Sequence, residues 1–276
     1  MPETLHPGAP MVRFVQISDT HISADPHYNT DGAQHTPMIG AQALVHQINT
    51  LPFAPDFVLH TGDVAYNPDE SAYGLAREIL SAIRFPVYYL VGNHDDAAMM
   101  RRFMLGQDAA SAPLDYEFEV NGVQVICMDS NRAAPPWMGR FSDEQMAWLD
   151  GLCRANDARP LIVALHHPVL PMGAPFWDNR MRMVDAEAIH RTLLQARDRL
   201  RGVFSGHVHQ NTDIVRDGIA YFTGLSSWYQ GHNYPDQQES EPDRFAEPGF
   251  SVVTVAREQI YVRRHRFIVD SGSLTS

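Results

Sequence analysis

Short apolar runs alternate with amphipathic stretches over the first hundred residues, a pattern typical of strand–helix repeats. Three apolar runs have the length of strands and cover residues 12–18, 56–61 and 86–91. A helix is expected after each of them, and in the first helix Leu44, Val45 and Ile48 are spaced to share one face. The three helices expected here cover residues 37–50, 69–83 and 95–105.

The pattern then changes toward hairpins. Asn121-Gly122 stands between two apolar runs, 115–119 and 123–128, and predicts a tight β-turn. Ser142, with Gln145 three residues later, indicates the capped start of a helix that ends near Ala155. Together these elements predict an α/β fold of two mixed sheets packed together, with the helices outside. The remaining expected elements are a helix at 184–196 and strands at 161–165, 202–205, 212–215, 220–222, 251–255 and 260–267.

No linker or internal repeat divides the chain, so we expect a single domain over residues 11–270. The ends, residues 1–10 and 271–276, are expected to be flexible tails. Loops longer than about 12–15 residues in a compact domain are usually functional or disordered. Three such loops are expected, at residues 22–36, 168–183 and 228–249.

Composition excludes several classes of protein. The formal net charge of −12 argues against a nucleic-acid polymer as partner, and no apolar run approaches the ~20 residues of a membrane span. No signal peptide is evident at the start, so a cytoplasmic protein is expected. Cys127 and Cys153 are too few for a disulfide framework and are interpreted as core residues. The informative excess is that of 14 histidines, because imidazole is a common metal ligand.

Five short polar motifs stand where predicted strands end. Ligand sites in α/β sheets form beyond the carboxyl ends of the strands, so the motifs are expected to converge. Each motif alone is more often a turn or capping feature, but five in succession, each after an apolar strand, predict one shared site. They are Asp19-Thr20-His21, Gly62-Asp63, Gly92-Asn93-His94-Asp95, His166-His167-Pro168 and Gly206-His207-Val208-His209.

The side chains in these motifs suit metal ions. Asp19 and His21 are two residues apart, and so are His207 and His209, so that an extended backbone points both members of each pair the same way. Carboxylate, imidazole and amide oxygen without thiolate favour intermediate ions such as Fe, Mn, Zn or Co over a structural zinc.

In this order, the motifs resemble those of the calcineurin-like metallophosphoesterases, and residues 13–209 look most similar to the bacterial cyclic-nucleotide and glycerophosphodiester phosphodiesterase branch. The resemblance implies a four-layer α/β/β/α sandwich and two metal ions, divalent or trivalent, bridged by Asp63. His94 would contact the phosphate or the leaving group, and His167 would lie behind the ligands or in the wall. The implied ligands are Asp19, His21, Asp63 and His209 for one metal, and Asp63, Asn93, His166 and His207 for the other.

The chemistry agrees with that implication. Two metals about 3.5–4 Å apart can clamp phosphate oxygens and lower the pKa of a shared water, and the resulting hydroxide attacks phosphorus. No nucleophilic Ser or Cys is needed. We therefore expect a dinuclear phosphodiesterase acting on a small soluble diester. A phosphomonoesterase or an enzyme for both ester types is the first alternative, and a non-catalytic scaffold of the same fold is a remote one.

Substrate-binding residues are less determined by the motifs. Some relatives have Asn three residues after the bridging Asp, where this chain has Tyr66, followed by Asn67. Trp228 and Tyr229 could stack on a nucleobase, although loop aromatics more often pack against the fold or a subunit of a homo-oligomer. We expect residues 228–234 to form a pocket wall and residues 235–248 to be mobile or ordered only by a partner.

Overall fold

The computed structural model describes residues 10–132, 135 and 137–269. The tails expected at residues 1–10 and 271–276 therefore lie outside the described residues, except for Pro10, where the first strand begins. No helix in the described part of the chain has the length and apolar character that a membrane crossing requires.

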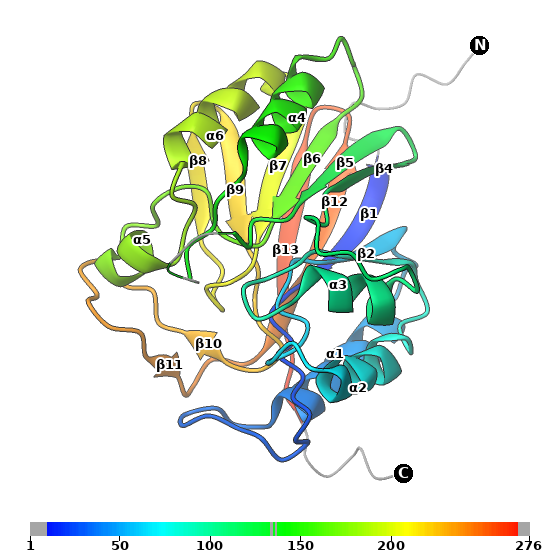
Figure 1. Ribbon diagram of the computed structural model, residues 1–276, viewed down its shortest axis with the longest axis vertical. Helices are drawn as coiled ribbons and strands as arrows, with labels where there is room; N and C mark the ends of the chain where they lie inside the picture. Colours follow the sequence, from blue (N-terminus) through cyan, green and yellow to red (C-terminus); the bar gives the residue numbers. More distant parts are fainter. Residues whose placement is uncertain (1–9, 133–134, 136, 270–276) are drawn as a thin grey trace.

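Two sheets form the centre of the molecule (Figure 1). In the first, the strand order is β13-β12-β1-β2-β3, with β1, β2 and β3 parallel. In the second, the order is β4-β5-β6-β7-β9-β8, with β5, β6, β7 and β9 parallel. The strands of the first sheet are β1 Pro10–Ile17, β2 Phe57–His60, β3 Val87–Tyr89, β12 Gly249–Ala256 and β13 Ile260–Arg266. Those of the second are β4 Tyr116–Val120, β5 Val123–Met128, β6 Leu161–Leu165, β7 Leu200–Ser205, β8 Asp213–Arg216 and β9 Ile219–Thr223.

Capping side chains begin four of the helices, among them Asp96 at the start of α3. Thr36 and Asp69 accept hydrogen bonds from backbone N–H groups in the first turns of α1 and α2. The capping box predicted at Ser142 and Gln145 is present at the start of α4. The helices are α1 Pro37–Asn49, α2 Glu70–Leu80, α3 Ala97–Met99, α4 Asp143–Arg154, α5 Pro175–Arg180 and α6 Ala186–Leu193, with a π-helical turn η1 at Met100–Met104 and a 3₁₀ turn η2 at Leu194–Ala196.

Three apolar layers hold the sheets and helices together. Phe14, Phe57 and Phe204 lie in the layer between the two sheets, where Phe14 stacks on Phe57 with ring centroids 4.9 Å apart. A second layer packs α1 and α2 on the first sheet, and a third packs α4 and α6 on the second. The order helix, sheet, sheet, helix is the predicted four-layer sandwich, and it resembles the metallophosphoesterase fold.

Parallel pairing brings the carboxyl ends of seven strands to one edge of the sandwich. The five predicted motifs follow β1, β2, β3, β6 and β7 at that edge. A sixth segment joins them, because β9 pairs parallel to β7 and is followed by residues 224–229. The fold therefore delivers the motif side chains and the start of the third long loop to the same place.

The structure differs from the sequence predictions in three segments. The helix expected at 95–105 is only three residues of α-helix followed by the π-helical turn, and it begins at Ala97 with Asp96 as its cap because the Asp95 carboxylate is engaged by Gly92 and Val64. The loop expected at 168–183 contains α5. Residues 235–248, expected to be mobile or ordered only by a partner, instead contain β11 (Pro242–Asp243), which pairs with β10 (Gln230–Gly231) of the same chain.

Candidate metal centre

The backbone at the motifs is unusual. Five of the predicted ligands have positive φ, between 45° and 74°, in the left-handed region that non-glycine residues rarely adopt. Such strain persists only where the surroundings enforce it, and it gathers at functional sites. Here it turns each side chain inward as its strand ends. The five residues are Asp19, His21, Asp63, His207 and His209.

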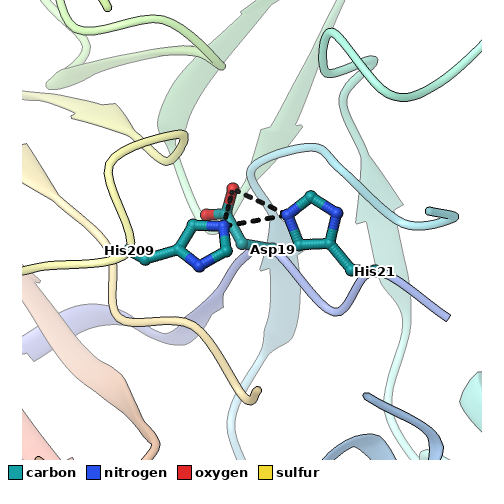
Figure 2. Close-up of side chains that lie close together, drawn as sticks. All are labelled: Asp19, His21 and His209. Carbon is teal, nitrogen blue, oxygen red and sulfur yellow. Dashed lines mark hydrogen bonds and ion pairs between the residues drawn. The ribbon is translucent and has the colours of Figure 1, made fainter. Parts of the chain in front are cut away.

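Asp19, His21 and His209 form a first cluster of ligand atoms (Figure 2). The two imidazole Nε2 atoms are 2.9 Å apart, and the Asp19 Oδ1 atom lies 3.5 Å from that of His209 and 3.9 Å from that of His21. All three side chains are buried. The His207 backbone N–H donates to the Asp19 carboxylate at 3.0 Å and 3.1 Å, which fixes the orientation of that carboxylate.

Asp63, His166 and His207 form a second cluster, and Asn93 adjoins it. The Nε2 atom of His166 lies 3.1 Å from Nδ1 of His207, 3.1 Å from Oδ1 of Asn93 and 3.3 Å from Oδ2 of Asp63. The same Asp63 Oδ2 atom is 3.5 Å from Nε2 of His21 in the first cluster. Asp63 therefore lies between the two clusters, as expected of the bridging residue.

Backbone carbonyls determine which ring nitrogens carry hydrogen. His166 donates through Nδ1 to the Thr61 carbonyl at 2.8 Å, and His207 donates through Nε2 to the Trp137 carbonyl at 2.9 Å. When these rings are neutral, the two nitrogens that face each other carry only lone pairs. The oxygens of Asp63 and Asn93 are acceptors as well. Four acceptors thus converge in a buried space, an arrangement that a bound cation would stabilise.

The pKa values of the buried histidines also indicate that the second cluster favours a positive charge. Burial acts to lower the pKa of His166, but the carboxylates of Asp63 and Asp19 outweigh it and raise that pKa to about 9. Burial lowers the pKa of His207 well below its usual value and that of His209 to about 4. Without a metal ion, the second cluster holds its positive charge as a proton on His166. The donor set fits a divalent cation, with nitrogen and oxygen donors and a shared carboxylate.

His94 approaches the centre from the half-buried side. Its backbone N–H donates to Asp63 Oδ1 at 2.9 Å, and its ring Nδ1 donates to the Tyr66 carbonyl at 2.7 Å. The ring packs edge-on against His21, with centroids 4.7 Å apart. Asp95, the last residue of the same motif, accepts hydrogen bonds from the backbone N–H groups of Val64 and Gly92 and thereby fixes both ligand loops.

Two of the residues considered for the substrate pocket do not line the cavity. His167 is buried behind His207, with ring centroids 4.5 Å apart, and its Nδ1 atom is 2.8 Å from the Ser130 hydroxyl. It therefore packs behind the predicted ligand His207 and does not form part of the pocket wall. Asn67 is exposed, and the structure does not bring it to the cavity, whereas Tyr66 beside it lines the cavity.

A cavity of about 310 Å³ opens over the two clusters. Trp228 and Tyr229 line it, as the sequence predicts for the start of the third loop. Tyr28, which the sequence motifs did not indicate, packs against Tyr66 with tilted rings whose centroids are 4.4 Å apart, and its ring centroid lies 5.8 Å from that of Trp228. Another side of the cavity was also missed and is formed by α5, through Phe176, Trp177 and Arg180.

Comparison with known proteins gives a consistent result. The model of the family described as calcineurin-like phosphoesterase matches residues 12–211. The chain is 27% identical to the cAMP/cGMP dual specificity phosphodiesterase of Mycobacterium tuberculosis, over 81% of this chain and 70% of that protein. It is 30% identical to the glycerophosphodiester phosphodiesterase GpdQ of Enterobacter lignolyticus, over 72% of this chain and 71% of that protein. The fold is similar to that of a dimetal phosphatase from Danio rerio, with a TM-score of 0.63 at 15% identity over 92% of this chain and 99% of that one.

Proposed function

The chain belongs to the calcineurin-like phosphoesterase family, and we propose that it is a dinuclear metal-dependent phosphodiesterase for small phosphodiesters of the cyclic-nucleotide or glycerophosphodiester class. Family membership makes it a metal-dependent phosphoric ester hydrolase. The observation that carries the two-metal proposal is the pair of buried ligand clusters with Asp63 between them, 3.5 Å from His21 on one side and 3.3 Å from His166 on the other.

The ligand assignment follows from the two clusters. Asp19, His21 and His209 would hold one ion, and His166, His207 and Asn93 would hold the other, with Asp63 serving both. When bound, two such ions polarise the phosphate and activate water at neutral pH. The backbone carbonyls of Thr61, Trp137 and Tyr229 would hold the imidazoles in place, because each accepts the hydrogen of one ring nitrogen.

His94 is proposed to act on the leaving group. Its Nδ1 atom is engaged by the Tyr66 carbonyl at 2.7 Å, which leaves Nε2 as the ring nitrogen available to a substrate in the cavity. In its doubly protonated form the ring can donate a proton from Nε2 to the departing alkoxide oxygen. Tyr66, Trp228 and Tyr229 would pack against the organic part of the diester, because their rings line the same cavity.

Parallel measurements of metal content and hydrolysis test this proposal. The protein should contain two equivalents of Mn, Fe, Zn or Co by mass spectrometry and should hydrolyse bis(p-nitrophenyl) phosphate faster than p-nitrophenyl phosphate. The reverse preference would indicate a phosphomonoesterase. A folded protein that holds metal and hydrolyses neither ester would instead support the scaffold alternative.

A pair of matched variants separates chemistry from folding. Asp63→Asn should lose metal and activity together, because the amide cannot supply a shared negative charge. Asp129→Asn is the control: Asp129 is also buried but accepts hydrogen bonds from the backbone N–H groups of Leu114 and Asn131, away from both clusters. Equal metal content and equal rates in Asp63→Asn and wild type would refute the shared-carboxylate assignment.

A further inference from the structure

Arg180 places an uncommitted positive charge in the cavity wall. It stands at the end of α5, and its guanidinium lies over the Phe176 ring at 5.3 Å from the centroid. Among the residues that the structure describes, no hydrogen bond or ion pair engages this guanidinium, and Asp63 is the one carboxylate of that set that lines the cavity. Asp63 is already surrounded by the imidazoles of the metal centre. Arg180 is therefore free to bind an anion that enters from solvent.

The position of α5 relative to the metal centre is fixed by Trp177. Its buried indole packs with Val208, the residue between the two predicted ligands His207 and His209, and its Nε1 atom donates to the His232 carbonyl at 3.0 Å. The backbone N–H of Phe176 donates to the Gln237 carbonyl at 2.9 Å, which joins α5 to the segment between β10 and β11 (Figure 1).

The nearby Arg182, in contrast to Arg180, uses its guanidinium to form hydrogen bonds with the backbone. Its Nε atom donates to the Asp178 carbonyl at 2.6 Å, and its Nη1 atom donates to the Met183 carbonyl at 2.8 Å. Those bonds keep its charge on backbone carbonyls within and just after α5. Arg180, two residues earlier, makes no such contact within the described chain and lines the cavity instead.

We propose that Arg180 forms an anion subsite that selects diesters with a second negatively charged group, a carboxylate or a phosphate, beyond the reacting phosphate. This inference rests on the proposed function, since the reacting phosphate would bind at the proposed metal centre while Arg180 binds the second anion. A guanidinium offers a planar pair of donors that matches either anion. Its contact with the Phe176 ring limits the positions that the guanidinium can adopt, which lowers the entropic cost of forming that pair of hydrogen bonds.

Binding of two matched phosphonates to the full-length, Mn²⁺-loaded protein tests the subsite. 3-Phosphonopropanoate and propylphosphonate differ by one carboxylate, and calorimetry should show about ten-fold tighter binding of the first. Arg180→Gln should weaken the binding of 3-phosphonopropanoate alone and so bring the two affinities within two-fold of each other. In Arg180→Glu, 3-phosphonopropanoate should bind more weakly than propylphosphonate. Arg191→Gln, which removes the same charge from an exposed position on α6, should keep the wild-type preference.

Turnover supplies an independent measurement with two matched diesters, carboxyethyl p-nitrophenyl phosphate and propyl p-nitrophenyl phosphate. In Arg180→Gln, the specificity constant should fall about ten-fold for the carboxyethyl ester and should stay within two-fold of wild type for the propyl ester. Equal wild-type affinity for the two phosphonates, or a preference that survives Arg180→Gln, would overturn the subsite. If the wild type hydrolyses no diester, the proposed function fails, and the binding preference still decides the role of Arg180.

Discussion

Gly92 lies directly against the Asp63 carboxylate, so that one added methyl group tests the geometry of the whole centre. A Cβ atom built on Gly92 meets both Oδ1 and the backbone nitrogen of Asp63 closer than the 3.0 Å that real Cβ atoms respect. The Gly92 backbone cannot readily withdraw, because its N–H donates to Asp95 at 3.0 Å and Asp95 also binds the N–H of Val64. In Gly92→Ala, the carboxylate of Asp63 must move.

The size of the effect follows from that displacement. Relieving the contact requires a shift of about 1 Å, and a misplacement of about 1 Å in a catalytic site can cost 10²-fold in rate. Overpacking of a buried position typically costs about 1–3 kcal/mol of unfolding free energy. Because Asp63 stands between the two clusters, both metals should be affected. We expect metal content to fall well below two equivalents and the specificity constant to fall at least 10²-fold.

Three measurements on one preparation check the prediction. They are metal content by mass spectrometry, hydrolysis of bis(p-nitrophenyl) phosphate, and urea unfolding. Gly74→Ala is the matched control, because Gly74 lies within α2 and a Cβ built there meets nothing within 4 Å. It should leave the centre intact and stabilise the protein by up to ~1 kcal/mol, since alanine favours helix over glycine. A Gly92→Ala protein with two metals and a rate within two-fold of wild type would refute the reasoning.

Four further outcomes are expected. A chelator should abolish hydrolysis and Mn²⁺, Co²⁺, Zn²⁺ or Fe²⁺ should restore it; full activity in metal-stripped protein would contradict the two-metal proposal. His94→Ala should keep both metals but lose about 10²–10⁴-fold in rate, and loss of metal would instead make His94 a ligand. Burial lowers the pKa of His60 from 6.5 to about 3, so the unfolded chain gains the proton first and stability is lost as the pH falls from 6.5 toward 3. In urea unfolding over this pH range, the unfolding free energy of the metal-free wild type should therefore fall by about 1.4 kcal/mol per pH unit more than that of His60→Gln. Parallel pH profiles of the two proteins would show that His60 does not cause this loss of stability. Alanine at both Trp228 and Tyr229 should change the ranking of diesters more than the rate on dimethyl phosphate, whereas equal losses would indicate a structural role.

The positions of the predicted ligands could be read from the sequence because they depend on local order. His166 follows the apolar run LIVAL directly, and Asp19 and His207 follow strands in the same way. Once the strands are parallel, their carboxyl ends meet, and no loop conformation needs to be known. The capping box at Ser142 and Gln145 was predictable for the same reason, since both members lie within one helical turn.

Predictions failed where a side chain serves a distant partner. Asp95 was expected to begin a helix, but its carboxylate accepts hydrogen bonds from Val64, 31 residues earlier, and from the Tyr73 hydroxyl. The chain then forms only a short helix and a π-helical turn after it. Intrinsic helix propensity has a small effect on stability, and the hydrogen bonds of a buried carboxylate to several donors outweigh it.

The cavity walls depend on contacts that span most of the chain. Trp228 donates a hydrogen bond to Asn29 at 3.0 Å across 199 residues, and this contact brings the loop of Tyr28 to the site. Trp177 reaches His232 across 55 residues and carries Arg180 with it. The motifs of the predicted metal ligands lie outside these loops. Substitutions in the walls should therefore change substrate choice while leaving metal binding intact, and substitutions in the motifs should change both together.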